Sequence, residues 1–444
     1  MRRIGTWILS GALLAPAALA EEPLTLPGAM ARARERSREA TAAGARKEAA
    51  VARARQASGF RLPSLTFTEM YVRTDAPAES FAFKMNKEQF SFPEFVSSDP
   101  NDPGWSGTAV TRLEAVWPLF TGGELSTRIK QAERVAEAAE QSAAHTSDRV
   151  AVEAAQAYVM VAQAEEYERL LTRARETVEA HVDLAEAYVG QGMLVRSELL
   201  RAQVELARVD DLLEEARGRV RVANANLAFR LGEVQSASWQ LSALPPPRPL
   251  EGDVAAWVAT AGARNDLAAA RSLLSAGEME EKAKKANLFP KLAVVARYDL
   301  FGTRLFGADG NNGTVMAVAS WNLFAGGSDR AAAIAAREEA RAGREEVARF
   351  EEGVALEVRQ AFEEAATARS RHTTAQKALE AAREAERITQ ERFAAGVVKT
   401  LDLLDATTAR REAETRELVA RADAHTAALK LALAAGRQPE SVLP

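Results

Sequence analysis

Apolar and polar positions along the chain follow two different periods. Four stretches of about eleven residues alternate in the manner of β-strands, and we expect strands at 63–73, 107–118, 290–300 and 314–324. Residues 125–189 contain neither proline nor glycine, which predicts a helix of nearly 100 Å at ~1.5 Å per residue. The remaining predicted helices cover 27–60, 197–231, 253–287, 328–394 and 400–435.

A seven-residue pattern occurs twice, 204 residues apart. Trp117-Pro-Leu-Phe-Thr-Gly-Gly123 returns as Trp321-Asn-Leu-Phe-Ala-Gly-Gly327, and the register holds as far as Gly232 and Gly436. Such a constant offset marks a duplicated unit, so we expect two structural repeats at 21–244 and 245–444. Each copy of the pattern reads as a strand, a tight turn and a helix, with glycines at the turn: Gly122, Gly123, Gly326 and Gly327.

Helix lengths indicate how the helices pack. The predicted helices 27–60 and 197–231 together contain about as many residues as the long helix 125–189. Stacked end to end, they would lie antiparallel beside it. Apolar residues spaced three or four apart form a coiled-coil-like seam in the second copy, at Val347, Phe350, Val354, Val358 and Phe362. The alternative is an ordinary bundle core, although helices of this length are unusual in globular proteins.

Two segments differ from this regular plan. Residues 74–106 are polar and aromatic, include four prolines, and are too long for a hairpin turn, so we expect an exposed functional loop. Residues 1–20 have a positive start, an apolar centre and a small-residue cleavage site ending at Ala20, which predicts a secretory signal peptide. An uncleaved anchor helix is the alternative, but the apolar centre is short for a membrane span.

Composition excludes several function classes. The formal net charge is −5 and no basic cluster is interleaved with aromatic residues, so we expect no nucleic-acid partner. The chain has no cysteine and no glycine-rich phosphate loop. Four histidines lack metal-ligand spacing, and we expect them on solvated helix faces: His145, His181, His372 and His425. We therefore predict no enzyme activity, cofactor or metal, and any energy must come from a partner.

The predicted strands have the length of tilted membrane-spanning β-strands. Four strands cannot close a barrel, because the smallest barrels have about eight. Open edges in lipid would leave backbone groups unsatisfied. If the strands span a membrane, several copies must contribute, and a homotrimer with a twelve-stranded barrel is the natural closed solution. A soluble four-stranded sheet that caps a helical bundle is the alternative.

The chain resembles the TolC family of outer-membrane efflux proteins. The resemblance rests on the signal peptide, on the helix-strand-strand-helix-helix plan used twice, and on the Leu-Phe-x-Gly-Gly corners. It also rests on the loop from Phe81 to Phe90 and on the turn Phe393-Ala-Ala-Gly396, which runs into Leu401-Asp-Leu-Leu-Asp-Ala-Thr-Thr408. It covers nearly the whole mature chain.

The resemblance implies a trimer, mainly α-helical, whose outer-membrane β-barrel continues as an α-helical tunnel across the periplasm. Such a duct would work with a periplasmic adaptor protein and an inner-membrane transporter to export small molecules or proteins. It would open like an iris at the periplasmic helix ends. The alternative is a periplasmic or secreted coiled-coil structural protein that never enters lipid.

By motif match, the resemblance places acidic rings at the tunnel constriction, from Asp402 and Asp405, with Glu198 at the equivalent turn. The turn glycines are Gly192 and Gly396. The family's best-studied member has an arginine where this chain has Val398, so the closing contacts differ here, and the neighbouring Lys399 is a candidate partner for Glu198. The helix dipole alone also favours carboxylates such as Asp402 in a first helical turn.

Overall fold

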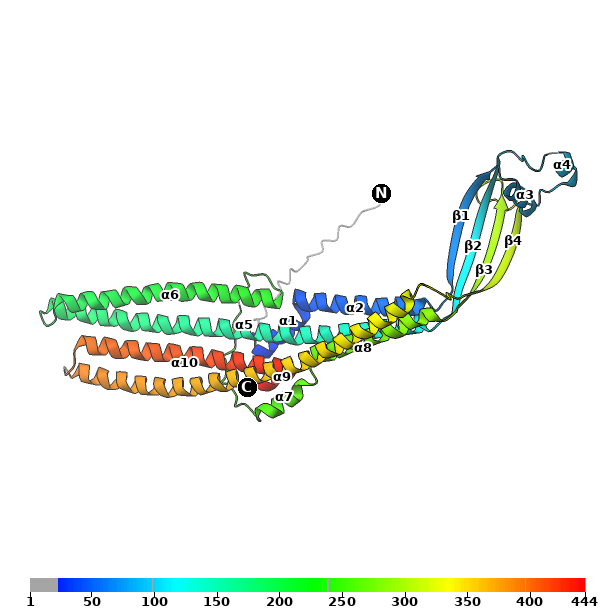
Figure 1. Cartoon of the computed structure of the whole chain (residues 1–444). Helices are drawn as coiled ribbons and strands as arrows, with labels where there is room; N and C mark the ends of the chain where they lie inside the picture. The colour runs from blue at the N-terminus through cyan, green and yellow to red at the C-terminus, as the bar shows by residue number, and fades with distance from the viewer. Residues whose placement is uncertain (1–22, 98, 238, 396, 444) are drawn as a thin grey trace, which may run out of the picture.

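The chain forms an elongated rod with a β-sheet at one end and long helices over the rest of its length (Figure 1). A computed structural model describes residues 23–97, 99–237, 239–395 and 397–443. The predicted signal peptide and Gly396 lie outside these described residues. The expectation of a mainly helical protein with a small set of strands is confirmed.

The sheet contains four antiparallel strands in the order in which they occur in the chain, β1 Ser64–Thr74, β2 Ser106–Thr121, β3 Lys291–Gly302 and β4 Gly310–Ser320. Its central pair, β2 and β3, joins the two repeats. The prediction of a strand at 314–324 is wrong at both ends. β4 starts at Gly310, and its pairing stops at Ser320 because its partner β3 begins opposite, at Lys291. Trp321 to Phe324 have no strand opposite them in β3 and lie outside the sheet.

Two helices of 67 residues each dominate the molecule, α5 Glu124–Gly190 and α9 Ser328–Ala394. At ~1.5 Å per residue, each is about 100 Å long. Each is followed by a partner helix that packs against it, α6 Arg196–Leu231 and α10 Thr400–Ala434. The two resulting hairpins lie side by side because α10 also packs against α5 (Figure 1).

The single helices predicted at 27–60 and 253–287 are each broken in two. The first consists of α1 Leu26–Arg36 and α2 Arg38–Gly59, and the second of α7 Val254–Ala261 and α8 Asn265–Lys285, followed by a 3-10 turn at Ala286–Leu288. At the first break Ser37 is extended, and its hydroxyl accepts the N–H of Ala40 at 3.1 Å as an N-cap.

The breaks lie where the returning helices end. Gly232 caps α6 in a left-handed conformation, and a Cβ on it would lie 2.4 Å from the carbonyl oxygen of Arg36. Gly436 follows α10 with a positive φ, and a Cβ on it would lie 2.8 Å from the side chain of Arg264. In each repeat, therefore, a glycine after the returning helix lies against the break, at a distance that a side chain on that glycine would not allow.

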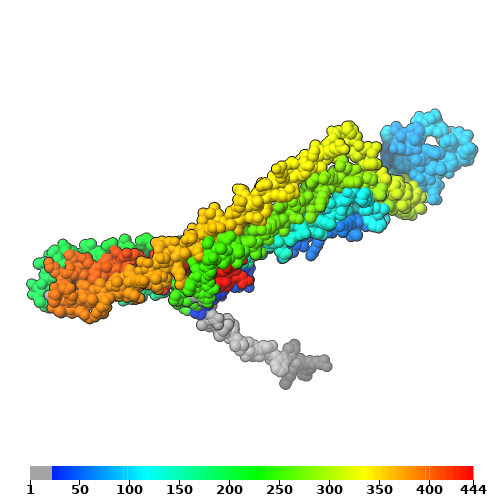
Figure 2. Space-filling model, turned by 60° about the horizontal axis from the view of Figure 1, so that its bottom comes forward, coloured from blue at the N-terminus to red at the C-terminus, as the bar shows by residue number. Residues whose placement is uncertain are grey.

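The largest apolar core lies at mid-length, where the short helices meet the long ones. It contains Met30, Tyr158 and Leu227 on the first-repeat side. Its second-repeat counterpart contains Trp257 and Leu431, together with Val354 and Val358 of the predicted seam. Figure 2 shows that the rod bends along its length. The expected long loop carries two short helices, α3 Pro77–Asn86 and α4 Phe92–Ser97, and the chain ends with a 3-10 turn at Pro439–Val442. No described helix is long and apolar enough to cross a membrane.

Candidate functional site

The sheet has one apolar and one polar face. Residues directly paired across neighbouring strands share a face, so the register assigns each row of side chains. One row contains Leu65, Ala115, Ala296 and Val315, and the next contains Phe67, Leu113 and Tyr298. Their large side chains are exposed, with Leu65 at 69%, Phe67 at 59% and Val315 at 78%. A continuous exposed apolar face of this kind is typical of a surface that contacts lipid or another chain.

The opposite face carries most of the strand charges, whereas Glu69 and Arg73 lie on the apolar face at the loop end of β1. One row contains Thr66, Glu114, Arg297 and Thr314, and the next contains Thr68, Arg112, Asp299 and Asn312. Asp299 is buried and accepts from Arg112 at 2.7 Å, while Arg297 lies 3.2 Å from its other oxygen. The face is therefore suited to water. Within the described chain, β1 and β4 each pair along one side only, so the sheet has two open edges.

The duplicated pattern forms the junction between sheet and helices. Gly122, Gly123, Gly326 and Gly327 all have positive φ, which glycine adopts without strain. The indole N–H of Trp117 donates to the carbonyl of Arg61 at 3.1 Å, and that of Trp321 donates to the carbonyl of Leu288 at 3.1 Å. Each tryptophan thus ties its corner to the end of the helix that precedes the repeat's first strand.

At the opposite end of the rod, Gly192 has φ +72° and ends α5, where Met193 N–H bonds back to the carbonyl of Tyr188. Asp402 and Asp405 are exposed in the first turns of α10. The carboxylate of Asp402 accepts the backbone N–H of Lys399 at 3.0 Å. Asp402 thus has a capping role within the protomer in addition to any role in a pore.

The remaining predicted tip residues are not brought together within one protomer. Glu198 lies 3.6 Å from Arg201 on its own helix, and no ion pair joins it to Lys399 among the described residues. Lys399 is exposed at the start of α10. The expected pairing of Lys399 with Glu198 therefore stays a prediction.

Ion pairs also connect the two helical hairpins, which the sequence did not predict. Arg411 of α10 donates to Glu205 of α6 at 2.9 Å, with only 9% and 18% of the two side chains exposed. Ten residues further along α10, Arg421 donates to Glu166 of α5 at 2.5 Å. The partners lie more than 200 residues apart in sequence, so no local pattern could have identified them.

The expectation of solvated histidines is wrong for His372 and His425, which are buried. His372 contacts Glu417 at 3.1 Å, and His425 contacts the carbonyl of Pro245 at 2.9 Å. Their helices are covered by neighbours on these faces, which a mixed-charge sequence does not reveal. Burial also lowers the pKa of His181 on α5, against the opposing effect of Glu386 on α9. No cluster of metal-ligating residues occurs in the described part of the chain.

This architecture is similar to that of known proteins. The sequence profile of the family described as "Outer membrane efflux protein" matches residues 29–233 and 259–437. No curated protein matches the sequence at a significant level.

Three solved structures illustrate the likeness in fold. The outer-membrane channel OprN is 21% identical to this chain, with a TM-score of 0.75. The aligned region covers 93% of this chain and 89% of OprN. VceC from Vibrio cholerae is 18% identical, covers 93% and 96%, and has a TM-score of 0.74. The open state of the MtrE channel from Neisseria gonorrhoeae is 19% identical, covers 93% and 89%, and has a TM-score of 0.75.

Proposed function

The chain belongs to the outer membrane efflux protein family, and from this premise we propose that it forms a trimeric export duct gated at its periplasmic end. Membership makes it a TolC-like outer-membrane protein with a channel role. The observation that carries the proposal is a four-stranded sheet with one apolar face, one charged face and two open edges, mounted on helices about 100 Å long.

The open edges support a trimer. In lipid, each unpaired backbone group costs several kcal/mol, so β1 of one copy must pair with β4 of another. Three copies would contribute twelve strands, enough to close a barrel, and every edge would be paired. The apolar face with Leu65 and Phe67 would meet lipid, and the face with Arg112 and Asp299 would line the lumen. The corner tryptophans would then lie near the membrane interface.

The helical hairpins would continue the barrel as a tunnel through the periplasm. Their turns would meet a periplasmic adaptor protein, and an inner-membrane transporter would supply the energy and the cargo. Asp402 and Asp405 are exposed at this end, so three copies would place six carboxylates around the axis. A ring of this kind favours cations and can be blocked by multivalent ones. The duct itself performs no catalysis.

Planar-bilayer recordings test the ring directly. We expect Asp402→Ala combined with Asp405→Ala to lower cation selectivity and to weaken block by multivalent cations. The matched control is Glu346→Ala, which removes an exposed carboxylate on α9 far from the tip. Selectivity and block equal to those of the control would remove the ring assignment. Recovery of the protein from the soluble periplasm, without a detergent-stable oligomer, would contradict the duct as a whole.

A further inference from the structure

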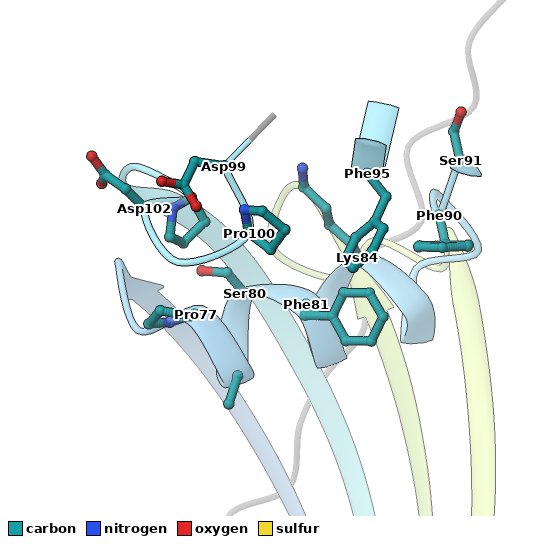
Figure 3. A pocket seen from close by; sticks show the side chains of 12 residues that line it. Pro77, Ser80, Phe81, Lys84, Phe90, Ser91, Phe95, Asp99, Pro100 and Asp102 are labelled. Carbon is teal, nitrogen blue, oxygen red and sulfur yellow. The ribbon is translucent and has the colours of Figure 1, made fainter. Parts of the chain in front are cut away.

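The loop between β1 and β2 folds into a pocket at the end of the sheet farthest from the helices (Figures 1 and 3). The pocket has a volume of about 350 Å³ and lies between α3, α4 and residues 99–103. Its apolar wall consists of the rings of Phe81, Phe90 and Phe95. The ring centroids are 5.6 to 5.9 Å apart, and each side chain stays 37–42% exposed. The rings thus pack together and still present faces to a ligand.

One side of α3 is anchored to the sheet, so the pocket wall that α3 forms is held in place. Phe83 packs against Phe301 of β3 with ring centroids 6.3 Å apart, and the ammonium of Lys87 donates to the carbonyl of Gly107 at 3.4 Å. The hydroxyl groups of Ser80 and Ser106 lie 3.0 Å apart. Phe81 lies on another side of the helix and lines the pocket, as Figure 3 shows. The pocket wall is therefore held by the sheet itself.

Charge at the rim is acidic overall. Asp99 and Asp102 line the pocket together with the single base Lys84, so the lining carries a formal charge of −1. One carboxylate oxygen of Asp99 accepts the backbone N–H of Asn101 at 2.9 Å, which fixes the side chain at the rim (Figure 3). Aromatic faces attract cations through the negative charge of their π-systems, and carboxylates add to that attraction. Prolines at positions 77, 100 and 103 supply further flat apolar surface.

We propose that this pocket binds an organic cation with a flat apolar body. The apolar body would rest against the three rings, and its positive charge would face Asp99 and Asp102. A pocket of this volume takes a ligand of drug-like size. The site goes beyond the proposed export function, because binding depends on one loop of one protomer and requires neither a pump nor an open gate.

The test measures binding of rhodamine 6G, a planar cation, to the full-length mature protein in detergent by fluorescence anisotropy. Fluorescein, with a related ring system and negative charge, is the comparison probe. We expect saturable binding of rhodamine 6G and much weaker binding of fluorescein. Phe81→Ala with Phe95→Ala should weaken rhodamine 6G binding about fivefold or more. The control Phe92→Ala removes a ring that is 68% exposed and outside the lining, and should bind like wild type.

A second variant separates binding from folding of the loop. Asp99→Asn with Asp102→Asn keeps the shape of the pocket and should weaken rhodamine 6G about threefold while fluorescein binding does not fall. Asp75→Asn, an exposed carboxylate of the same loop outside the lining, is its control. Equal affinity of wild type for the two dyes would overturn the proposal, as would phenylalanine variants that match Phe92→Ala. Bilayer conductance is measured separately, so failure of this site and failure of the duct are distinguishable.

Discussion

The link between Arg411 and Glu205 offers a direct test of how the periplasmic end is held. Arg411 lies on α10 and Glu205 on α6, so their contact joins the two helical hairpins of one protomer. In the proposed duct, iris-like opening would move the α9–α10 hairpin relative to the α5–α6 hairpin. Arg411→Ala removes the contact without altering either hairpin turn, and we expect it to favour the open state.

The structure allows the size of the effect to be estimated. The two groups are 2.9 Å apart, and 9% and 18% of their side chains are exposed. A charge-assisted hydrogen bond of this kind contributes about 2 kcal/mol net, which corresponds to roughly a 30-fold shift in the closed-to-open equilibrium for each protomer. Three such links in a trimer would make the change in open probability large.

Single-channel recordings in planar bilayers measure this shift as open probability. Arg416→Ala is the matched control on the same helix, because Arg416 is 70% exposed and its contacts are to Glu412 within α10. Glu205→Gln keeps the side-chain shape and should change open probability in the same direction as Arg411→Ala, by a smaller amount. If Arg411→Ala and Arg416→Ala gave the same open probability, the link would have no part in closure.

Three further predictions concern stability, each measured as thermal unfolding by circular dichroism. Burial lowers the pKa of His181 below its ordinary 6.5, so the unfolded chain binds the proton more readily than the folded chain. Stability should therefore fall as the pH drops below about 6.5. His181→Gln should reduce that fall, and a pH profile of stability equal to that of wild type would contradict the assignment. Gly122→Ala should lower the unfolding temperature more than Gly326→Ala. Both glycines have positive φ, but only a Cβ on Gly122 would meet a backbone oxygen, that of Ala286 at 2.4 Å. Equal losses of stability in the two variants would show that this close approach is unimportant. Tyr158→Phe should cost about 1 to 3 kcal/mol, because the single proton of its buried hydroxyl is shared between two backbone carbonyls at 2.8 and 2.9 Å. An unchanged unfolding temperature would contradict this prediction.

Much of the fold is readable from local pattern. Alternation in the strands, the absence of Pro and Gly in the first long helix and the repeated Trp-to-Gly-Gly corner each act within a few residues of the chain. Strand, helix and left-handed turn are decided at that range by side-chain spacing and by backbone sterics. The family resemblance, carried by the order of these elements, is confirmed by the match over residues 29–233 and 259–437.

The candidate site was readable only in part. The positions of Asp402 and Asp405 after a turn were expected, and the structure finds both exposed at the start of α10. Their convergence in a ring stays a prediction, because the structure describes a single copy of the chain. The pocket around Phe81 could be suspected only as a long aromatic loop, since its walls come from segments whose approach no periodicity encodes.

Contacts between distant segments were decided by the tertiary structure alone. The helix predicted at 27–60 breaks at Ser37 because the end of α6, nearly 200 residues later, packs against that point through Gly232. His372 and His425 are buried because neighbouring segments cover faces that look solvated in sequence. Arg411 pairs with Glu205 only because the two hairpins lie side by side. Local sterics determine where helices, strands and turns form. Burial and ion pairing depend on which helix surfaces meet. In a chain of repeated mixed-charge helices, many helix faces have nearly the same sequence character, so only the packed structure shows which of them are covered.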